Sequence, residues 1–485
     1  MTVVETIRGA PLAGLRERLA AAADGPVAVT LATAEFCPDA TAWIGLALAA
    51  APDWLALYAD HADGPAADRR GRLLPHLKPD FSWLYLLARD FVEPFVVYER
   101  RTLAAAVQRL LDAGAAPRTA AEAVYAVALE ALHGVDPRRV LHVREPLAML
   151  PSSPAPDLHH TAAEALARRG VAARATPHPA DPALHEFAFG RSATPPVSIV
   201  IPTKNAAALV RSCIDSLRAT AGYDAYDVTV IDHDSDEPAL ADYLERETAA
   251  GRLSVLRWSG PFNYAAMNNA AVRRLDAPLV LLLNNDIDGF SPGWLDQLVA
   301  TIQLDPGLAA VGCLLHYPDG DIQHAGVVFT PRRPGFHGHA GLPRDALGYR
   351  GRVRSLQEYS AVTAALMLVR REAFLAVGGF DEAFPNDYND VDLCLRLRRA
   401  GHAIAYTPHV HAVHWESRTR TAKWTGKDRY TARWAEFFGR DPFYGPYFSA
   451  RAFVPDAAER LWRERKTVAL HAALGGPAAA PPDGR

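Results

Sequence analysis

Short apolar runs alternate with helix-length segments between residues 197 and 284. The runs at 197–202, 227–232 and 278–283 have the length and continuous hydrophobicity of strands that are buried on both faces. Segments of helical length separate these runs, at 206–219 and 237–250. This alternation predicts an α/β unit built on a largely parallel sheet.

Polar residues follow each of the three predicted strands. They are Thr203, Lys204 and Asn205 after the first, Asp232, His233 and Asp234 after the second, and Asn284, Asn285 and Asp286 after the third. Ligands of open α/β sheets bind beyond the carboxyl ends of the strands. The three strand ends therefore predict one polar crevice.

The first part of the chain repeats the order of elements found in the second part. In each part an apolar run is followed by a polar turn, a helix and another apolar run, and the two sets of runs are 26–31 with 55–60, and 278–283 with 309–317. A helix predicted at 124–132 falls where the helix at 390–397 falls in the second part. This order predicts that the first part is a degenerate, partial copy of the second, and chance similarity of alanine-rich helices is the alternative.

A proline-rich stretch separates the two parts. Prolines recur from Pro151 to Pro196 around one short alanine-rich helical stretch, which is typical of a junction between domains. The 485 residues also exceed the ~250–300 at which a single hydrophobic core stops growing. We expect a first module at 1–150, a linker with a short helix at 151–195, a second module at 196–417, and a helical extension with a disordered end at 418–485.

Charge and cysteine content exclude several classes of protein. The net charge is −4 and 22% of the residues are charged, so no basic surplus favours nucleic acid as a partner. The four cysteines are far apart and form no C-x-x-C pair, which argues against a disulfide framework or a structural zinc site. No apolar segment reaches the ~20 residues that cross a bilayer, and the first residues lack a secretory pattern. These features predict a cytoplasmic protein.

Two carboxylates come directly after the third predicted strand. Asp286 and Asp288 are separated by one residue, and alternation along an extended chain would place both on one side. Hard oxygen ligands in this position suit Mg²⁺ or Mn²⁺, which bridges protein carboxylates to a substrate diphosphate. Aspartates after a strand also form turns and cap helices, so a metal site and a capping turn are both open from this motif.

An acidic cluster begins a predicted helix that Gly401 ends. Asp387, Asp390 and Asp392 lie at its start. Acidic residues favour the first helical turn through capping and the macrodipole, but one cap does not need three carboxylates. A carboxylate fixed at this position, beside a crevice, can accept a proton from a hydroxyl group.

Three histidines follow in one predicted strand. An extended conformation puts His409 and His411 on one face and His414 on the other, which argues against a compact three-histidine zinc site. One imidazole that reaches a metal fits the pattern better, and a structural role is the alternative for each ring.

Taken together, these segments resemble the family 2 glycosyltransferases of the GT-A fold, in particular the bacterial surface-polysaccharide branch with rhamnosyl- and galactofuranosyl-type enzymes. The resemblance covers residues 197–417 and rests on segments that begin at Val197, Val230, Asn263, Leu283, Asp321, Ser360, Asn389 and Val413. It implies a GT-A Rossmann-like mixed sheet and the transfer of a sugar from a nucleotide-diphosphate sugar to an acceptor hydroxyl.

The resemblance also implies roles for individual residues. The nucleotide pocket would contain Pro202, Thr203, Asp232, His233, Asn269 and Asp286. Asp286, Asp288 and His414 would hold the metal, and Asp390 would be the general base. Asn389 stands where the family often has glutamate, and His233 where Asp or Asn is common.

Cofactors and partners follow from the same resemblance. The expected cation is Mg²⁺ or Mn²⁺, and the expected donor is a UDP-, dTDP- or GDP-sugar. The acceptor would be a glycan or lipid-linked glycan of a bacterial surface polysaccharide, which implies a cytoplasmic protein, including the inner face of the membrane. One base and one cation suffice for an inverting single displacement, and no carboxylate nucleophile is needed.

The first module lacks these chemical groups. Its segment from Leu31 to Phe36 offers only Glu35, and Val124 and Ala126 stand where the second module has Asp390 and Asp392. We therefore interpret residues 1–150 as a degenerate, truncated GT-A-like module without catalytic function.

Two other functions compete with this prediction. A nucleotidyltransferase would be expected to have a glycine-rich phosphate loop after the first strand, and residues 201–205 contain no glycine. A non-catalytic scaffold fits the decay of the first module, but not the joint presence of the acidic and histidine motifs. The aromatic tail from Trp424 to Trp462 is consistent with an acceptor-side lid, a peripheral membrane contact, or ordinary helix packing, which is slightly favoured.

Overall fold

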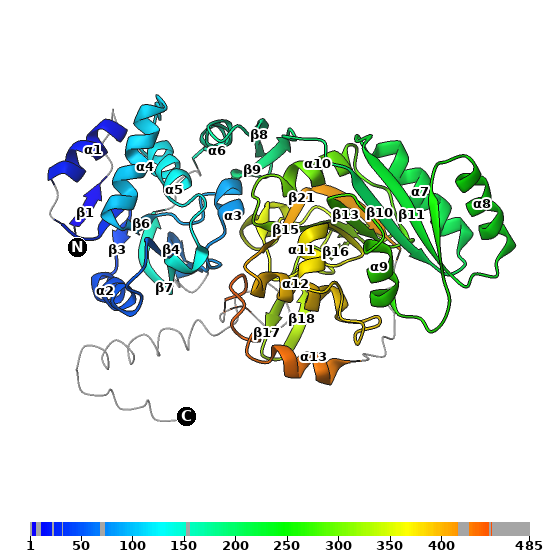
Figure 1. Cartoon of the computed structure of the whole chain (residues 1–485). Helices are drawn as coiled ribbons and strands as arrows, with labels where there is room; N and C mark the ends of the chain where they lie inside the picture. The colour runs from blue at the N-terminus through cyan, green and yellow to red at the C-terminus, as the bar shows by residue number, and fades with distance from the viewer. Residues whose placement is uncertain are drawn as a thin grey trace.

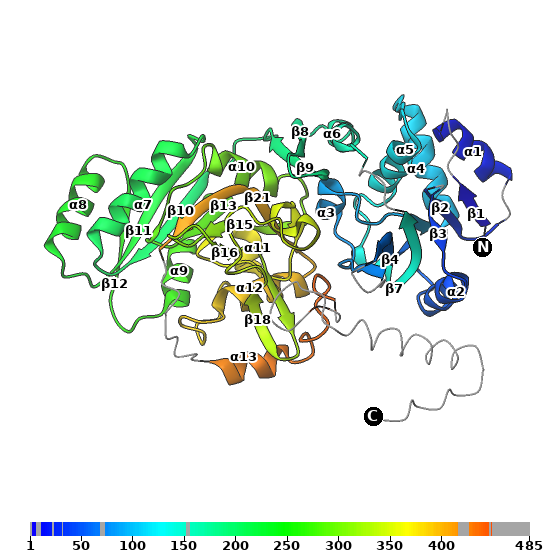
Figure 2. The same cartoon turned by 180° about the vertical axis from the view of Figure 1, so that it is seen from behind.

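The computed structural model describes residues 2–5, 11–21, 24–31, 33–67, 73–151, 156–415, 426–445 and 448. Figures 1 and 2 show two α/β modules side by side, the first coloured blue to cyan and the second green to orange. One helix and one hairpin lie between them, namely α6 (His159–Ala167) and the pair β8 (Ala173–His178) and β9 (Asp181–Phe189).

The second module is built on a mixed sheet. Its strand order is β12-β11-β10-β13-β20-β15-β21-β14, with β16 beside β15 and β19 beside β21. The bounds are β10 (Val197–Thr203), β11 (Tyr226–His233), β12 (Ser254–Trp258), β13 (Leu279–Leu283), β14 (Ile287–Asp288), β15 (Leu308–His316), β16 (Ile322–His324), β19 (Gln357–Glu358), β20 (Leu366–Arg370) and β21 (Ala403–His414). A separate hairpin joins β17 (Val327–Thr330) and β18 (Arg333–His337).

Helices cover both faces of this sheet. The helices α7 (Ala207–Thr220), α8 (Pro238–Ala249) and α10 (Trp294–Ile302) pack on one face, and α9 (Tyr264–Val272), α11 (Arg371–Ala376) and α12 (Asn389–Arg399) pack on the other. The three predicted runs form β10, β11 and β13, which are neighbours in the sheet. Every residue of β10 and β13 is buried, as the continuous apolar runs predict, whereas β11 is partly exposed over its first residues.

The first module has a smaller sheet with the order β1-β2-β6-β4-β7-β3, and β5 beside β4. Its strands are β1 (Thr2–Glu5), β2 (Val27–Thr30), β3 (Glu35–Phe36), β4 (Ala56–Ala67), β5 (Leu73–His76), β6 (Phe95–Tyr98) and β7 (Val140–Pro151). Its helices are α1 (Pro11–Ala21), α2 (Ala40–Ala50), α3 (Trp83–Ala88), α4 (Arg100–Asp112) and α5 (Ala120–Ala131).

The path from β2 to β3 repeats the path from β13 to β14. In the first module, β4–β7 is parallel and the pairs β2–β6, β4–β6, β4–β5 and β3–β7 are antiparallel. In the second module, β15–β21 is parallel and the corresponding pairs β13–β20, β15–β20, β15–β16 and β14–β21 are antiparallel. The pairs β4–β7 and β15–β21 both contain a register shift. Strand β1, parallel to β2, occupies the place of β10, while the described residues of the first module contain no partner strand like β11 or β12.

At the end of the shared strand, the structural alignment of the two modules differs from the sequence alignment by one residue. The Leu31 amide donates to the Pro94 carbonyl (3.0 Å), just as the Asn284 amide donates to the Ala365 carbonyl (2.9 Å). The sequence comparison pairs Leu31 with Leu283 instead. The loop that follows the strand in the first module is one residue longer, because Glu35 still occupies the β-bridge position of Ile287.

The segment at 151–195 is more than the expected linker. It contains the expected helix, α6, but also the β8–β9 hairpin, in which Pro177 and Pro182 are accommodated because a two-stranded ribbon has open edges. The hairpin is fastened to the second module where the Phe189 amide donates to Gln297 Oε1 (3.0 Å).

The described part of the C-terminal extension forms helix α13 (Lys427–Trp434), which packs on α12. The Trp434 indole donates to Asp392 (3.0 Å), and the Tyr430 ring stacks on Tyr388 with centroids 4.3 Å apart. Trp424, Trp462 and the end expected to be disordered lie outside the described residues. Within those residues, no helix is long and apolar enough to cross a membrane.

Candidate active site

Left-handed backbone conformations mark the polar ends of the strands. Asn205 follows β10 (φ 57°), Asp234 follows β11 (φ 45°) and Tyr388 precedes α12 (φ 65°). Residues other than glycine seldom adopt positive φ, and such residues are common at functional sites. The predicted crevice is thus bordered by backbone that the surrounding structure holds in unfavourable conformations.

A pocket of about 240 Å³ opens at these strand ends. Its walls come from β10, β11, the loop before α9, α9 itself and the turn after β13, and include Pro202, Thr203, His233, Phe262, Tyr264 and Asp286. Thr203 Oγ1 accepts a hydrogen bond from the side-chain nitrogen of Asn285 (2.8 Å), and this bond joins the ends of β10 and β13. Phe262 is 52% exposed at the rim and lies beside the His233 ring, with centroids 5.9 Å apart.

Asp286 faces His414 across the end of the sheet. Asp286 Oδ1 and His414 Nε2 are 3.2 Å apart, because Ile287 of β14 pairs with His414 of β21. The contact is an approach of two ligand atoms and not a hydrogen bond, since no described residue donates to Asp286 Oδ1. Two ligands of one octahedral cation with bonds of ~2.1 Å lie ~3 Å apart, so this pair can share a metal ion.

Gln323 orients the His414 ring. Its Nδ1 lies 2.7 Å from Gln323 Oε1, and its Nε2 lies 3.3 Å from the side-chain nitrogen of Asn284 and 3.2 Å from Asp286 Oδ1. In the neutral tautomer that donates from Nδ1 to Gln323, Nε2 has the lone pair that could bind a metal. An imidazole oriented by an acceptor behind it is the usual arrangement of a metal ligand.

Asp288 has hydrogen-bond partners of its own, so the placing of both carboxylates at one metal stays a prediction. The chain turns at Asn285 and Asp286, and it does not continue as an extended strand from β13 to β14. Asp288 accepts hydrogen bonds from Ser212 of α7 (2.8 Å) and from the Trp415 indole (2.8 Å). It braces the segment that follows His414.

Asp390 is held at the start of α12 on the other side of Tyr264. Its two oxygens accept hydrogen bonds from the Ala364 amide (3.1 Å) and from the Val391 amide (2.7 Å). The Tyr264 hydroxyl donates to the Ala364 carbonyl (3.2 Å), so a single residue, Ala364, links it to Asp390. Burial, followed by the charges of Asp390 and Asp286, raises the pKa of Tyr264, which places both carboxylates near this buried phenol.

Asp392 belongs to the packing of α12. It is completely buried and accepts hydrogen bonds from Arg396 (2.7 Å), Arg433 (2.8 Å) and Trp434. Of the carboxylates at the start of this helix, Asp390 and not Asp392 is turned toward Ala364 and Tyr264. The two aspartates of this helical turn therefore have different environments: Asp392 pairs with arginines inside the packing, and Asp390 contacts Ala364.

The nucleotide residues expected on β11 lie at the pocket in different ways. His233 lines the pocket, and its Nε2 lies 2.8 Å from the Gly260 carbonyl. Asp232 is buried beneath it and forms an ion pair with Arg257 of the neighbouring strand β12. Asp232 Oδ1 is buried and has no hydrogen-bond donor among the described residues.

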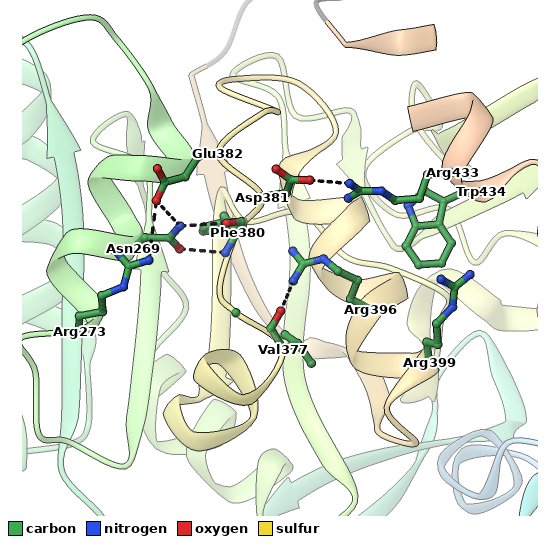
Figure 3. Close-up of a pocket in the computed structure, with 11 residues that line it drawn as sticks. Asn269, Arg273, Val377, Phe380, Asp381, Glu382, Arg396, Arg399, Arg433 and Trp434 are labelled. Carbon is green, nitrogen blue, oxygen red and sulfur yellow. Dashed lines mark hydrogen bonds and ion pairs between the residues drawn. The ribbon is translucent and has the colours of Figure 1, made fainter. Parts of the chain in front are cut away.

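Asn269 does not belong to the nucleotide pocket, which corrects the expectation. Figure 3 shows its amide directed at the loop around Phe380, where it accepts from the Phe380 amide (2.8 Å) and donates to the Phe380 carbonyl (2.9 Å). Met267 lines the pocket at the strand ends. Asn269 is two residues farther along the helix, so its side chain points to the opposite side of α9. Asn269 therefore anchors the loop that leads to α12.

The remaining histidines follow the alternation predicted for the strand. His414 lies on the buried face of β21, and His409 and His411 lie on its other face, away from the Asp286 carboxylate. His409 packs against Phe187 and Phe189 of the hairpin, at centroid distances of 6.1 and 6.0 Å.

Sequence reasoning missed several residues of this site. Tyr264 and Gln323 lie inside segments that carry the resemblance, at Asn263 and Asp321, so their position in those motifs is a usable signal. Trp415 likewise lies in the segment that begins at Val413. Phe262 had no comparable signal, because an exposed aromatic residue is ordinary in a sequence and gains meaning only from its place at a pocket.

Comparisons with known proteins agree with this geometry. Residues 195–436 match the family model described as "Glycosyltransferase like family 2". The O-antigen biosynthesis protein RfbC of Myxococcus xanthus is 35% identical over 432 residues, which are 86% of this chain and 33% of that protein. The uncharacterized protein y4gI of Sinorhizobium fredii is 32% identical over 433 residues, which are 84% of this chain and 47% of that protein.

A shorter match involves the N-acetylglucosaminyl-diphospho-decaprenol L-rhamnosyltransferase of Mycobacterium tuberculosis. It is 31% identical over 156 residues, which are 31% of this chain and 49% of that protein. The chain thus spans between a third and a half of the length of these relatives. The resemblance inferred from the sequence is confirmed for the second module.

Proposed function

Residues 195–436 belong to glycosyltransferase family 2 and form a GT-A-type mixed sheet, and on this premise we propose that the chain transfers a sugar from a nucleotide-diphosphate sugar to an acceptor hydroxyl. The observation that carries the proposal is the pair Asp286 and His414, 3.2 Å apart beside the pocket at the ends of β10, β11 and β13. A carboxylate oxygen and an imidazole nitrogen are ligands that fit Mn²⁺ or Mg²⁺.

Asp286 and His414 would hold this cation together with the donor diphosphate. A divalent cation at that point stabilises the negative charge on the departing nucleoside diphosphate. Asp288, bound to Ser212 and to the Trp415 indole, keeps His414 and Trp415 in place behind the site. In this proposal Asp286 contacts the cation directly, and Asp288 acts chiefly through Trp415.

Asp390 accepts the proton of the acceptor hydroxyl. Its oxygens are fixed by the amides of Ala364 and Val391, so the carboxylate does not need to reorient during the reaction. Only one carboxylate is required on the acceptor side, because the new glycosidic bond forms as the bond to the diphosphate breaks. The product therefore has the anomeric configuration opposite to that of the donor.

The nucleotide lies against β10 and β11. Phe262 at the rim and the His233 ring offer aromatic surface to a base, and Thr203 and Asn285 offer polar groups beside the diphosphate. The buried Asp232 oxygen supports recognition of a base N–H, through a small movement of the pair with Arg257. The sugar would be a hexose or deoxyhexose.

The acceptor is a glycan or a lipid-linked glycan of a bacterial surface polysaccharide. The names of two relatives, an O-antigen biosynthesis protein and a rhamnosyltransferase, support this assignment. A cytoplasmic location, including the inner face of the membrane, fits a nucleotide-sugar donor.

A donor screen tests the proposal. UDP-, GDP- and dTDP-sugars are added to the full chain with Mn²⁺, and the melting temperature is recorded. Since a ligand at about 100 times its Kd contributes ~2.7 kcal/mol, the correct donor gives a clear shift. EDTA should cancel the shift for the wild-type chain. A shift with a donor that persists in EDTA, or none with any donor, would contradict the proposal.

A further inference from the structure

A second group of metal-ligating side chains lies in the first module, on different residues from the donor pocket. We propose that His61, His76 and Glu93 bind a divalent transition-metal ion, zinc in particular, which joins the β4–β5 hairpin to the loop before β6. This site is independent of the proposed glycosyl transfer.

The distances among these three residues match a metal site. His61 and His76 are paired across β4 and β5, so their side chains lie on the same face, and His61 Nε2 is 3.3 Å from His76 Nδ1. One ligand atom from each of the three residues lies within 4.8 Å of the other two. Two imidazole nitrogens bound tetrahedrally at ~2.0–2.1 Å lie ~3.3–3.4 Å apart, which is the spacing of this pair.

The ligand chemistry favours zinc over the cation of the donor site. Two imidazoles and one carboxylate form an N₂O set, which suits a borderline-soft ion with tetrahedral geometry. Magnesium and calcium prefer sites made of oxygen ligands. A solvent molecule would complete the coordination, because Glu93 is partly exposed while both imidazoles are buried.

Positive charge beside the two imidazoles opposes a cation. The ammonium group of Lys78 donates to the carbonyls of Ala59 and Glu93. A metal must therefore be held by its three ligands against this repulsion.

Carboxylates offset part of that repulsion. Glu93 brings one negative charge as a ligand. Asp60 is buried beside the hairpin and accepts a hydrogen bond from the Lys78 amide (2.9 Å).

The ion would stabilise the contact between the two modules. The residues on each side of His76 bind Tyr349 of the second module, because the Leu77 amide donates to the Tyr349 hydroxyl (2.9 Å) and that hydroxyl donates to the Pro75 carbonyl (3.2 Å). Fixing His76 therefore fixes the strand that holds Tyr349. The expected effect of the metal is higher thermal stability of the full chain.

A hydrogen bond between the two imidazoles alone also accounts for the 3.3 Å distance, so the experiment must separate the two arrangements. The full chain carrying Asp286→Ala, which removes the donor-site cation, is stripped with a chelator and titrated with Co²⁺ and with Zn²⁺. We expect visible Co²⁺ absorption of tetrahedral type, saturation at about one ion per chain, and a melting temperature that rises with Zn²⁺.

His76→Asn in the same background tests the ligand assignment. Asparagine keeps a hydrogen-bonding group for His61 but is a poor zinc ligand, so Zn²⁺ affinity should fall by more than ~100-fold, since even outer-shell changes cost 10- to 100-fold. The matched control is His185→Asn, another buried histidine, whose Nδ1 contacts the Leu87 carbonyl (3.0 Å). The control should bind Co²⁺ as its parent does.

The parent chain alone can overturn the proposal, whether or not the variants fold. Absence of tetrahedral Co²⁺ absorption together with no thermal shift in Zn²⁺ means that the two rings share only a hydrogen bond. Binding that His76→Asn retains in full, in a chain with unchanged circular dichroism, also contradicts it.

Discussion

The two modules have separate sheets with a common strand order, but the residues at the polar edges of the two sheets differ. From β2 to β3 and from β13 to β14, the strands follow the same order in the same directions. At the edge, the second module has Asp286 and His414, and the equivalent bridge in the first module pairs Glu35 with Met149 where the second pairs Ile287 with His414. The comparison separates the residues that make the fold from those that carry the chemistry.

The shared part is set by buried aliphatic residues. Val27, Ala28 and Val29 of β2 are 0–1% exposed, as are Val280, Leu281 and Leu282 of β13. Burial of one such side chain contributes ~1.5–3 kcal/mol, whereas a polar residue in the loop after the strand contributes little to folding. The loop can therefore lose its carboxylates while the sheet survives, and fold alone does not indicate function.

The first module has a different set of polar groups, in the corresponding part of its sheet. His142 lies between Asp60 (2.9 Å) and Asp80 (3.0 Å), and its ring stacks on Tyr58 at a centroid distance of 4.7 Å. This buried network connects β4 and β7, at the position in the sheet that β15 and β21 occupy in the second module. Its described contacts stabilise the module, and the pair His61 and His76 lies next to it along β4.

The largest expected effect comes from Asp286→Ala. We expect turnover to fall by ~10³-fold or more, because several kcal/mol of charge stabilisation depend on the cation, and metal-dependent donor binding should be lost. The measurement is transfer from the donor found in the screen. Thr33→Ala is the control, since Thr33 follows Leu31 as Asp286 follows Asn284 in the aligned edges. Full activity of Asp286→Ala would mean that Asp286 does not distinguish the second module from the first in function.

Asp390→Asn is expected to have a somewhat smaller effect. Turnover should fall by ~10²- to 10⁴-fold, the usual contribution of general-base catalysis, while donor binding persists. Asparagine keeps the shape and can still accept from the Ala364 amide, so α12 should remain folded. Steady-state kinetics and the anomeric configuration of the product are measured. A product that retains the donor configuration would exclude a single displacement.

The sequence predicted the strands better than the site because the two depend on different information. The continuous apolar runs at β10, β11 and β13 predicted buried strands without any tertiary contact. The hydrogen bonds of Asp288 could not be predicted, since they depend on Ser212 of a distant helix and on the Trp415 indole. Alternation along a strand is informative only while the strand continues.

For other site residues, the local pattern gave a group of candidates and the resemblance selected one. His414 and Asp390 were expected from motif positions, and the structure brings each to the polar edge. Asn269 was expected from the same source and lies on the wrong side of α9, because a motif fixes sequence position but not which side of a helix faces the ligand. His61 and His76 had no sequence signal, since the hairpin that pairs them was not predicted.

His414→Met places in the second module the residue that the first module has at the matching position. We expect donor-dependent turnover to fall by ~10- to 100-fold, because Met is a poor ligand for Mn²⁺ and the link to Gln323 is lost. Raising the Mn²⁺ concentration should restore part of the activity. The reciprocal change, Met149→His, should leave turnover unchanged, and a comparable loss in both variants would mean that the two edges act together.

The smallest expected effect is on the pH dependence of stability. Burial alone would lower the pKa of His142, but the charges and hydrogen bonds of Asp60 and Asp80 outweigh it, so that this pKa is raised. A raised pKa in the folded state stabilises the protein below the unfolded value of ~6.5, and this stabilisation is lost as the pH rises through the folded value. Arg144, which pairs with Asp80 (2.8 Å), stays charged throughout this range.

The difference in melting temperature between the wild-type chain and His142→Gln, measured in EDTA, should therefore be largest below about pH 6.5 and should shrink toward alkaline pH. The control is His185→Asn, because burial lowers the pKa of His185 to about 4. A lowered histidine pKa destabilises the folded state on acidification, so the sign of its pH dependence is opposite. If both differences change with pH in the same direction, the charged His142 network does not stabilise the first module.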